Sequence, residues 1–321
     1  MSDWSFLVPP DVGVTLRART RPALLARCLG DETAPVAHPA LLIDFTAAAD
    51  GAGALVRGRY KGVPWRCLVE QRDGGRRIAF RSPLLREYLT LHIVLLPALR
   101  RLLLERDVAL VTGATFVKNG GATVLTGLAG SGKTAALLAM LANGAQLIGD
   151  EYAGISGAGE VTPVLRVIAL RRAALGAAPE LSQRLTPTRR LMLRAAVLGG
   201  ALSMRRLDPL VHVSPGELGL TSKGSATPLS RLVWLERSAG GPRRAPMDTA
   251  QAIDALRRAL EAHDTAYGVS AALAIDSSRW RETLARGLRD VECARVTLPL
   301  RPLAPEAIRD LIGAARVGPS T

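Results

Sequence analysis

One eight-residue stretch restricts the fold of this chain more than any other feature of the sequence. It matches the phosphate-binding pattern G-x-x-x-x-G-K-[ST] at every fixed position and reads Gly127, Leu128, Ala129, Gly130, Ser131, Gly132, Lys133, Thr134. An apolar run over 122–126 predicts a buried strand before it, and the run over 135–142 predicts a helix after it. This is the context that the pattern requires. The alternative is a glycine-rich turn that binds nothing.

The loop predicts a nucleotide site in which each residue type has a physical role. Its glycines leave backbone N–H groups free to surround phosphate oxygens at a helix N-terminus, where the helix dipole also favours negative charge. Lys133 is expected to reach the β- and γ-phosphates of ATP or GTP, and the Thr134 hydroxyl to bind Mg²⁺. The expected nucleotide-binding residues are Gly127, Gly130, Ser131, Gly132, Lys133 and Thr134.

The next predicted strand ends in two adjacent carboxylates. The apolar run over 145–149 predicts this strand, and Asp150 and Glu151 follow it directly. One carboxylate of such a pair can hold Mg²⁺ while the other accepts a proton from an attacking hydroxyl. An ordinary polar turn after a strand is the alternative.

The stretch GLAGSGKTAALLAMLANGAQLIGDEY resembles the HPr serine kinase/phosphorylase family and its smaller relatives among bacterial peptide-tailoring kinases, which share a fold with ATP-dependent phosphoenolpyruvate carboxykinase. In that family a strand, the loop, an apolar helix and a strand ending in Asp-Asp follow one another without insertion. The resemblance implies that Asp150 is the catalytic proton acceptor and that Glu151 replaces the second Asp as a metal ligand. Together with the loop, this gives Asp150 and Lys133 as catalytic residues and Thr134 and Glu151 as metal ligands.

The resemblance extends over residues 108–170 and departs from the family at two places. Thr112 stands where the family usually has a His that helps to organise the phosphates and the catalytic carboxylate. The Glu-x-Arg-Gly-x-Gly segment that the phosphorylase reaction uses has no counterpart in the sequence. Thr112, and Glu151 in place of Asp, leave a second function open. This is a nucleotide-gated binding or scaffold protein in a biosynthetic or regulatory complex, without transfer activity.

Composition and cysteine usage limit the class of protein. With 321 residues, 48% of them hydrophobic, the chain can bury a large core. Cys28, Cys67 and Cys293 are far apart and lack metal-ligand spacing, which favours buried thiols in a reducing compartment. The start of the chain does not resemble a signal peptide, and the apolar run over 89–104 is interrupted by a proline and two arginines. We therefore expect a cytoplasmic protein without a membrane segment, in which residues 89–104 form a core helix.

The elements expected along the chain indicate two units. Residues 1–40 contain one predicted helix, over 22–29, and are expected to form a peripheral cap. Short β-rich pieces between 41 and 81 predict a small antiparallel sheet. These parts give an N-terminal α+β domain over 1–105. Residues 106–321 are predicted to form an α/β nucleotide domain with a mixed sheet flanked by helices, and the resemblance implies the HPr-kinase/phosphoenolpyruvate-carboxykinase type.

A strongly basic segment follows the acid pair. Between 165 and 210, nine arginines accompany only Glu180 and Asp208, which accounts for half of the chain's net charge of +14. Either these arginines are solvated surface cations, or some of them bind phosphates or an acidic substrate, since a guanidinium binds both bidentately. The nine residues are Arg166, Arg171, Arg172, Arg184, Arg189, Arg190, Arg194, Arg205 and Arg206.

The distribution of aromatic residues argues against a nucleic-acid partner. They make up only 4% of the chain and do not alternate with basic residues, as a base-stacking surface would require. The leading prediction is an ATP-dependent kinase that uses Mg²⁺ and phosphorylates a Ser/Thr-type hydroxyl on a peptide, a protein or a small metabolite. The acceptor is expected to be acidic if the arginines contact it. The sequence leaves open whether ATP or GTP is used and whether the chain forms a homo- or hetero-oligomer.

Overall fold

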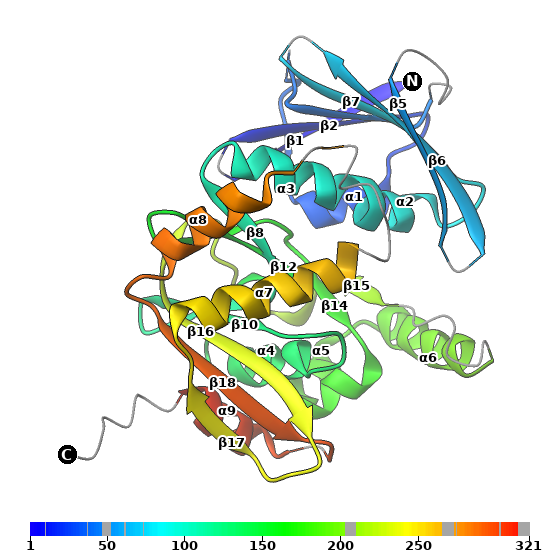
Figure 1. The fold of residues 1–321 in the computed structure, drawn as a ribbon. Helices are drawn as coiled ribbons and strands as arrows, with labels where there is room; N and C mark the ends of the chain where they lie inside the picture. Colours follow the sequence, from blue (N-terminus) through cyan, green and yellow to red (C-terminus); the bar gives the residue numbers. More distant parts are fainter. Residues whose placement is uncertain are drawn as a thin grey trace.

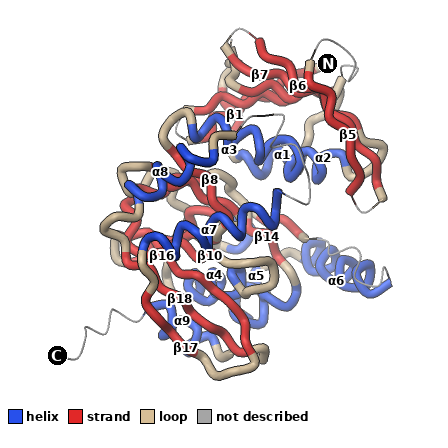
Figure 2. The backbone as a smooth tube through the Cα atoms, viewed as in Figure 1, coloured by secondary structure: helices blue, strands red, loops and turns tan. Residues whose placement is uncertain are grey.

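The computed structural model describes residues 1–9, 11–36, 38–46, 53–60, 62–72, 74–202, 210–264, 273, 275–301 and 303–313. Two large β-sheets and the helices packed on them make up the fold (Figure 1, Figure 2). Each large sheet contains both parallel and antiparallel pairs, so the chain belongs to the mixed α/β class, as predicted. Among the described residues, every helix is too short or too polar to pass through a lipid bilayer.

The N-terminal sheet has seven strands in the order β3-β1-β2-β4-β7-β6-β5. The β2–β4 and β4–β7 pairs are parallel, and the other pairs are antiparallel. The strand bounds are β1 (Ser2–Val8), β2 (Val12–Ala18), β3 (Glu32–Thr33), β4 (Leu41–Asp44), β5 (Ala54–Tyr60), β6 (Val63–Arg72) and β7 (Gly75–Arg81).

Two predictions about this half of the chain are wrong. Residues 1–40 are not a peripheral cap, because they contribute β1, β2 and β3 to the sheet, and β2 pairs directly with β4. The sheet is also not purely antiparallel, since the β2–β4 pair is parallel. Buried polar residues in β1 and β2 interrupt the alternation of apolar and polar residues by which a strand is recognised in the sequence. Ser5 of β1 and Thr15 of β2 are both buried, and their hydroxyls are hydrogen-bonded to each other at 3.1 Å. This pairing satisfies both groups only in the folded hairpin.

The helices of the N-terminal half pack on one face of this sheet. They are α1 (Ala23–Leu29), as predicted, and a longer helical segment made of α2 (Arg86–Leu89), a π-helical stretch (Thr90–Leu95) and α3 (Leu96–Leu104). The run over 89–104 is therefore a buried core helix, as predicted. The predicted domain division at 105/106 falls in the turn after α3. Apolar residues on both sides of it, including Leu103 and Leu110, belong to one core.

The central sheet lies in the C-terminal half. Its strand order is β11-β9-β10-β16-β13-β12-β8, and β18 pairs with both β16 and β17. β10, β16 and β18 are mutually parallel, and β11 runs in the same direction because both β10 and β11 are antiparallel to β9. The strand bounds are β8 (Val108–Thr112), β9 (Ala114–Lys118), β10 (Gly121–Thr126), β11 (Gln146–Gly149), β12 (Tyr152–Ser156), β13 (Glu160–Pro163), β16 (Thr227–Ser238), β17 (Arg243–Pro246) and β18 (Glu292–Pro299).

Helices cover both faces of the central sheet (Figure 1). One face carries α4 (Lys133–Ala142), the short 3₁₀-helix η2 (Arg172–Ala177), α5 (Pro179–Arg184) and α9 (Pro305–Gly313). The other face carries α7 (Thr249–Asp264) and α8 (Ser277–Gly287). α6 (Pro187–Leu202) projects away from the sheet. A two-stranded ribbon, β14 (Ile168–Leu170) and β15 (Val211–Val213), is followed by the 3₁₀-helix η3 (Pro215–Leu218).

This topology brings the predicted functional segments together. The carboxyl ends of β10, β11, β16 and β18 lie at one edge of the central sheet, because these strands run in the same direction. The phosphate loop follows β10, and the acid pair follows β11. Ligands of open α/β sheets are usually bound at such an edge.

Candidate functional site

The phosphate loop connects β10 to α4, as predicted. Gly127, Gly130 and Gly132 all have positive φ angles, of 146°, 82° and 101°. At Gly127 a side chain is also excluded by space, because a Cβ atom there would lie 2.3 Å from the carbonyl oxygen of Leu235 on β16. At Gly130 a Cβ atom would meet nothing within 4 Å. The loop conformation therefore needs glycine at 130 for its backbone angle and at 127 for close approach to β16 as well.

We expect Gly127→Ala and Gly130→Ala to differ sharply. Gly130→Ala adds only backbone strain, on the order of 1–3 kcal/mol. Gly127→Ala adds a clash with the backbone of β16, so this variant should lose more unfolding free energy than Gly130→Ala. It should also be stabilised less by nucleotide. Urea unfolding of the two variants measures this difference. Equal losses would show that the close approach of β16 does not constrain the loop.

Lys133 is the first residue of α4 and lies folded back on the loop. Its Nζ donates hydrogen bonds to the carbonyl oxygens of Gly127 at 2.8 Å and Leu128 at 3.0 Å. Burial lowers the pKa of the Lys133 ammonium, while the nearby charges of Asp150 and Glu151 raise it. Gly132 precedes the helix and offers no side-chain cap, so the first N–H groups of α4 are left for another acceptor.

Asp150 is the most enclosed carboxylate of the site, with 1% of its surface exposed. Its Oδ1 accepts a hydrogen bond from the Glu151 N–H at 2.9 Å. Its Oδ2 accepts from the Ala169 N–H at 3.1 Å and from the Thr134 hydroxyl at 3.4 Å. Burial and then the charge of Glu151 raise the pKa of Asp150 to about 7, although the two backbone N–H groups and Lys133 act in the opposite direction.

The raised pKa of Asp150 predicts a pH-dependent loss of stability. The carboxyl has a pKa of about 3.9 in an unfolded chain, so between about pH 4 and 7 the native state binds this proton more tightly. Its contribution to folding is fully present below pH 4 and is lost as the pH rises to about 7.

We expect Asp150→Asn to remove this dependence. The unfolding free energy of the variant relative to wild type should rise by about 2–3 kcal/mol between pH 5 and 8, as measured by urea unfolding at both values. A constant offset is also expected, since one side of the Asn amide must face an N–H donor. A difference that stays the same at the two pH values would contradict the raised pKa.

Glu151 adopts a left-handed backbone conformation, with φ of 70°, directly after Asp150. The N–H of Gly113 donates to the Glu151 carbonyl oxygen at 2.9 Å, which holds this turn against the end of β8. The Glu151 side chain points toward His212, whose Nε2 lies 3.7 Å from Glu151 Oε2. A non-glycine residue in this conformation is strained, and such strain is typical of functional turns.

Sequence reasoning missed His212 as a member of this site. It is 5% exposed, and it lies on β15 directly across from Ala169, the residue whose N–H binds Asp150. A single histidine between two valines gives no sequence signal for this role. Only the β14–β15 register brings it to the acid pair.

Residues of the N-terminal half contact segments next to the acid pair. Arg27 of α1 donates from Nη1 to the His212 carbonyl oxygen at 3.2 Å, and the Arg166 N–H donates to the Cys28 carbonyl oxygen at 2.9 Å. Cys28 lies close enough for the Glu151 charge to add to the effect of burial, and both raise the pKa of its thiol. All three cysteines are buried and free, as predicted.

The loop and the acid pair line one cavity of about 520 Å³. Seven of the sequence-predicted site residues line it: Gly127, Gly130, Gly132, Lys133, Thr134, Asp150 and Glu151. Ser131 is in the loop but not in this lining. Thr112 also lines the cavity, and among the described residues its buried hydroxyl has no hydrogen-bond partner. A cavity of this size is in the range of small-molecule sites.

Of the nine arginines, the structure places Arg171 on the wall of this cavity. Arg184 donates to the carbonyl oxygens of Leu218 and Gly219. Arg189 forms an ion pair with Glu217 at 2.8 Å, so it is not a solvated rim charge. Arg205 and Arg206 lie outside the described residues. Among the described members of the nine, Arg171 is the one that lines the main cavity, so the hypothesis of an arginine at the acceptor site rests on it.

The oxygen donors at the cavity fit Mg²⁺. The Thr134 hydroxyl and the Asp150 and Glu151 carboxylates line it together, and hard oxygen ligands of this kind suit Mg²⁺, which usually keeps waters and binds one or two carboxylates together with substrate phosphates. The described residues contain no group of three or more His, Cys, Asp and Glu side chains that could hold a metal by themselves. The residues therefore fit a cation that is completed by phosphate oxygens.

Comparison with known proteins adds no assignment, since no protein-family model and no curated protein sequence matches the chain.

Proposed function

We propose that the chain is an HPr-kinase-like phosphotransferase, which moves the γ-phosphate of ATP or GTP to a Ser/Thr-type hydroxyl of a peptide, a protein or a small metabolite. The observation that carries the proposal is the position of Asp150. It is a buried carboxylate on the wall of the cavity that the phosphate loop also lines, and it contacts Thr134 of that loop. The order of strand, loop, helix, strand and acid pair supports the same family.

Lys133, Thr134, Asp150 and Glu151 each have a role in this transfer. The free N–H groups at the start of α4 hold the phosphates, and Lys133 turns from the loop carbonyls to the phosphate oxygens. Thr134 and Glu151 would hold Mg²⁺, which would supply positive charge next to the phosphate oxygens. The acceptor oxygen bonds to the γ-phosphorus as the bond to the bridging oxygen breaks, the nucleoside diphosphate leaves, and the acceptor proton passes to Asp150. A pKa of about 7 suits a general base at neutral pH.

A second candidate function is a nucleotide-gated binding or scaffold protein without transfer. Two observations favour it. Thr112 lines the cavity without an ionisable group, and both Asp150 oxygens already accept backbone N–H groups. In that case nucleotide binding would order the loop and the acid pair without chemistry.

Phosphorus NMR distinguishes the two candidates. Wild-type protein is incubated with ATP, Mg²⁺ and a panel of serine and threonine peptides and small alcohols. The kinase proposal expects a new phosphoester signal, or release of inorganic phosphate to water above the protein-free rate. Bound nucleotide without any turnover above background would favour the scaffold.

A further inference from the structure

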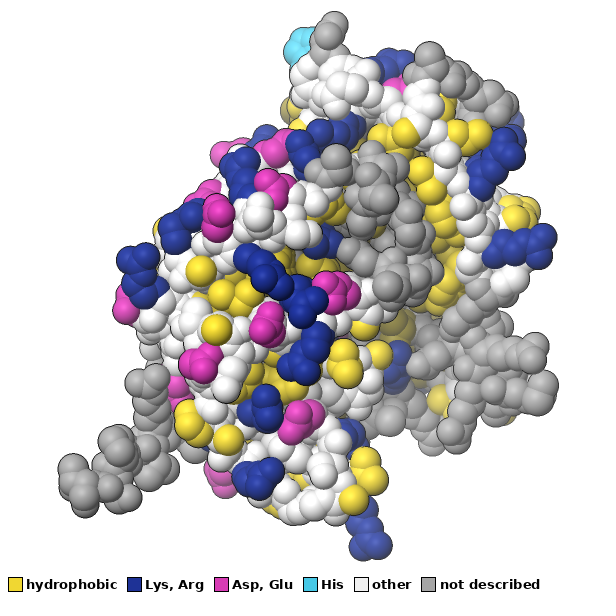
Figure 3. Space-filling model, in the orientation of Figure 1, with side chains coloured by type: hydrophobic (Ala, Val, Ile, Leu, Met, Phe, Trp, Pro, Cys, Tyr) yellow, Lys and Arg dark blue, Asp and Glu magenta, His cyan; other side chains and the backbone are white. Residues whose placement is uncertain are grey.

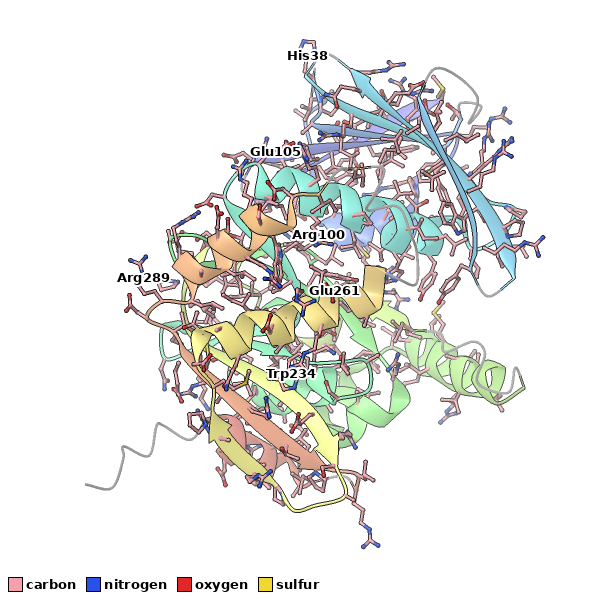
Figure 4. All side chains as sticks on the ribbon, in the orientation of Figure 1. His38, Arg100, Glu105, Trp234, Glu261 and Arg289 are labelled. Atoms are coloured by element: carbon pink, nitrogen blue, oxygen red, sulfur yellow. The ribbon has the colours of Figure 1, made fainter. Side chains whose placement is uncertain are left out.

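A second cavity, of about 370 Å³, adjoins the phosphate loop. Loop residues 128–131 form one wall of it, and the end of β16 with side chains of α7 and β18 forms the rest. Figure 4 shows Trp234 of β16 beneath α7, where this wall lies. The residues beyond the loop are Trp234, Leu235, Glu236, Arg237, Arg258 and Arg295.

Ser131 faces this second cavity rather than the main one. It lines only the second cavity, whereas its loop neighbour Gly132 lines only the main one and Gly130 lines both. The residue is 6% exposed, and within the described part of the chain its hydroxyl has no hydrogen-bond partner. A buried hydroxyl without a partner is costly, so it points to a ligand that supplies the acceptor.

Three arginines give the cavity an excess of positive charge over its one carboxylate. The Arg258 guanidinium lies 5.9 Å from the centre of the Trp234 ring, which holds it in place. Arg295 has a buried Nε without a hydrogen-bond partner among the described residues. Arg237 donates from Nη1 to the Leu300 carbonyl oxygen at 3.1 Å, which leaves Nη2 and Nε for another acceptor. No ion pair found within the described ranges includes these three side chains.

One carboxylate, that of Glu236, lines the cavity together with the three guanidinium groups and offsets only part of their charge. Glu236 accepts a hydrogen bond from the Thr297 hydroxyl at 3.1 Å. Elsewhere on the same helix, Arg257 is paired with Glu261 at 2.8 Å, and the face in Figure 3 shows basic side chains interspersed with acidic ones over α7 and α8. Among the described residues, the three arginines at the cavity therefore differ from Arg257, which forms an ion pair.

We propose that this second cavity binds a small phosphate-type oxyanion, separately from the nucleotide in the main cavity. Guanidinium groups match the geometry of phosphate oxygens bidentately, and the Ser131 hydroxyl adds a donor on the loop side. The volume is within the range of small-ligand sites. Residues 128–130 and Arg237 line both cavities, so we expect a ligand in one cavity to change the affinity of the other, by the same factor in each direction.

Pyrophosphate is the probe, with binding measured by isothermal titration calorimetry and by Trp234 fluorescence. Two preparations are compared: Lys133→Ala, which weakens phosphate binding in the main cavity, and wild type saturated with Mg²⁺ and a non-hydrolysable ATP analogue, which fills the main cavity. The proposal expects one pyrophosphate site in both preparations. Binding in Lys133→Ala that disappears when nucleotide fills the wild-type protein would make the cavity part of the nucleotide site and overturn the proposal.

Variants test the arginines. In the Lys133→Ala background, Arg258→Gln with Arg295→Gln should weaken pyrophosphate binding at least about tenfold, since hydrogen bonds to charged groups contribute about 1.5–3 kcal/mol. Arg257→Gln is the matched control on α7 and should leave the affinity unchanged. Equal affinity in all three proteins, or citrate binding as tightly as pyrophosphate, would overturn a phosphate-type site. Failure here leaves the kinase proposal untouched, because that proposal is tested at the main cavity.

Discussion

Lys133→Ala is expected to abolish most of the thermal stabilisation that ATP or GTP with Mg²⁺ gives to the wild-type protein. A ligand that binds only the native state stabilises it by about 2.7 kcal/mol at about 100 times its Kd. In the structure Lys133 Nζ is held 2.8 Å from the Gly127 carbonyl oxygen at the loop, beside the wall where phosphates are expected. Without the ammonium group, the phosphates lose the positive charge of Lys133, and the loop loses the hydrogen bond from Nζ to the Gly127 carbonyl oxygen. Differential scanning fluorimetry with increasing nucleotide measures the shift.

Lys118→Ala is the matched control for this experiment. Lys118 lies at the end of β9, is exposed, and is absent from the lining of the main cavity. Its replacement should leave the nucleotide-dependent Tm shift unchanged. A wild-type protein that shows no shift at millimolar nucleotide would remove the nucleotide site. A full shift in Lys133→Ala would leave the lysine without a role in binding.

Asp150→Asn is expected to slow phosphoryl transfer, or background hydrolysis, by roughly 10²-fold or more while nucleotide binding is kept, because a general base contributes about 10²–10⁴-fold. The amide can still accept one of the two backbone hydrogen bonds, but it cannot take the acceptor proton. The rate of transfer in wild type should also rise with pH toward about 7, as the carboxyl loses its proton. Phosphorus NMR gives the rate, and displacement of a fluorescent nucleotide gives the affinity.

Two outcomes would count against this role for Asp150. If the variant transfers phosphate as fast as wild type, another group takes the proton. If the variant also loses nucleotide affinity, Asp150 holds the loop through Thr134 and not the acceptor proton. If the transfer rate of wild type shows no ionisation near pH 7, the titration of Asp150 does not control the transfer step.

The local elements of the nucleotide half could be predicted from the sequence, because their signals are short-range. The loop glycines indicate positions with positive φ angles, and the apolar runs before and after the loop predict β10 and α4. The run before Asp150 likewise predicted β11. The strands within residues 1–40 could not be predicted, because the buried hydroxyls of Ser5 and Thr15 interrupt the apolar alternation of β1 and β2.

The loop, the helix after it and the acid pair follow from local sequence, since each is encoded by residues that are neighbours in the chain. The residues that surround them are brought there by the tertiary fold. Ala169, His212 and Arg171 reach the acid pair only through the β14–β15 register and the turn after it. The second cavity likewise joins the loop to side chains of α7 and β18, more than 100 residues away in sequence. Contacts of this kind depend on how strands pair and helices pack, and no local pattern encodes them.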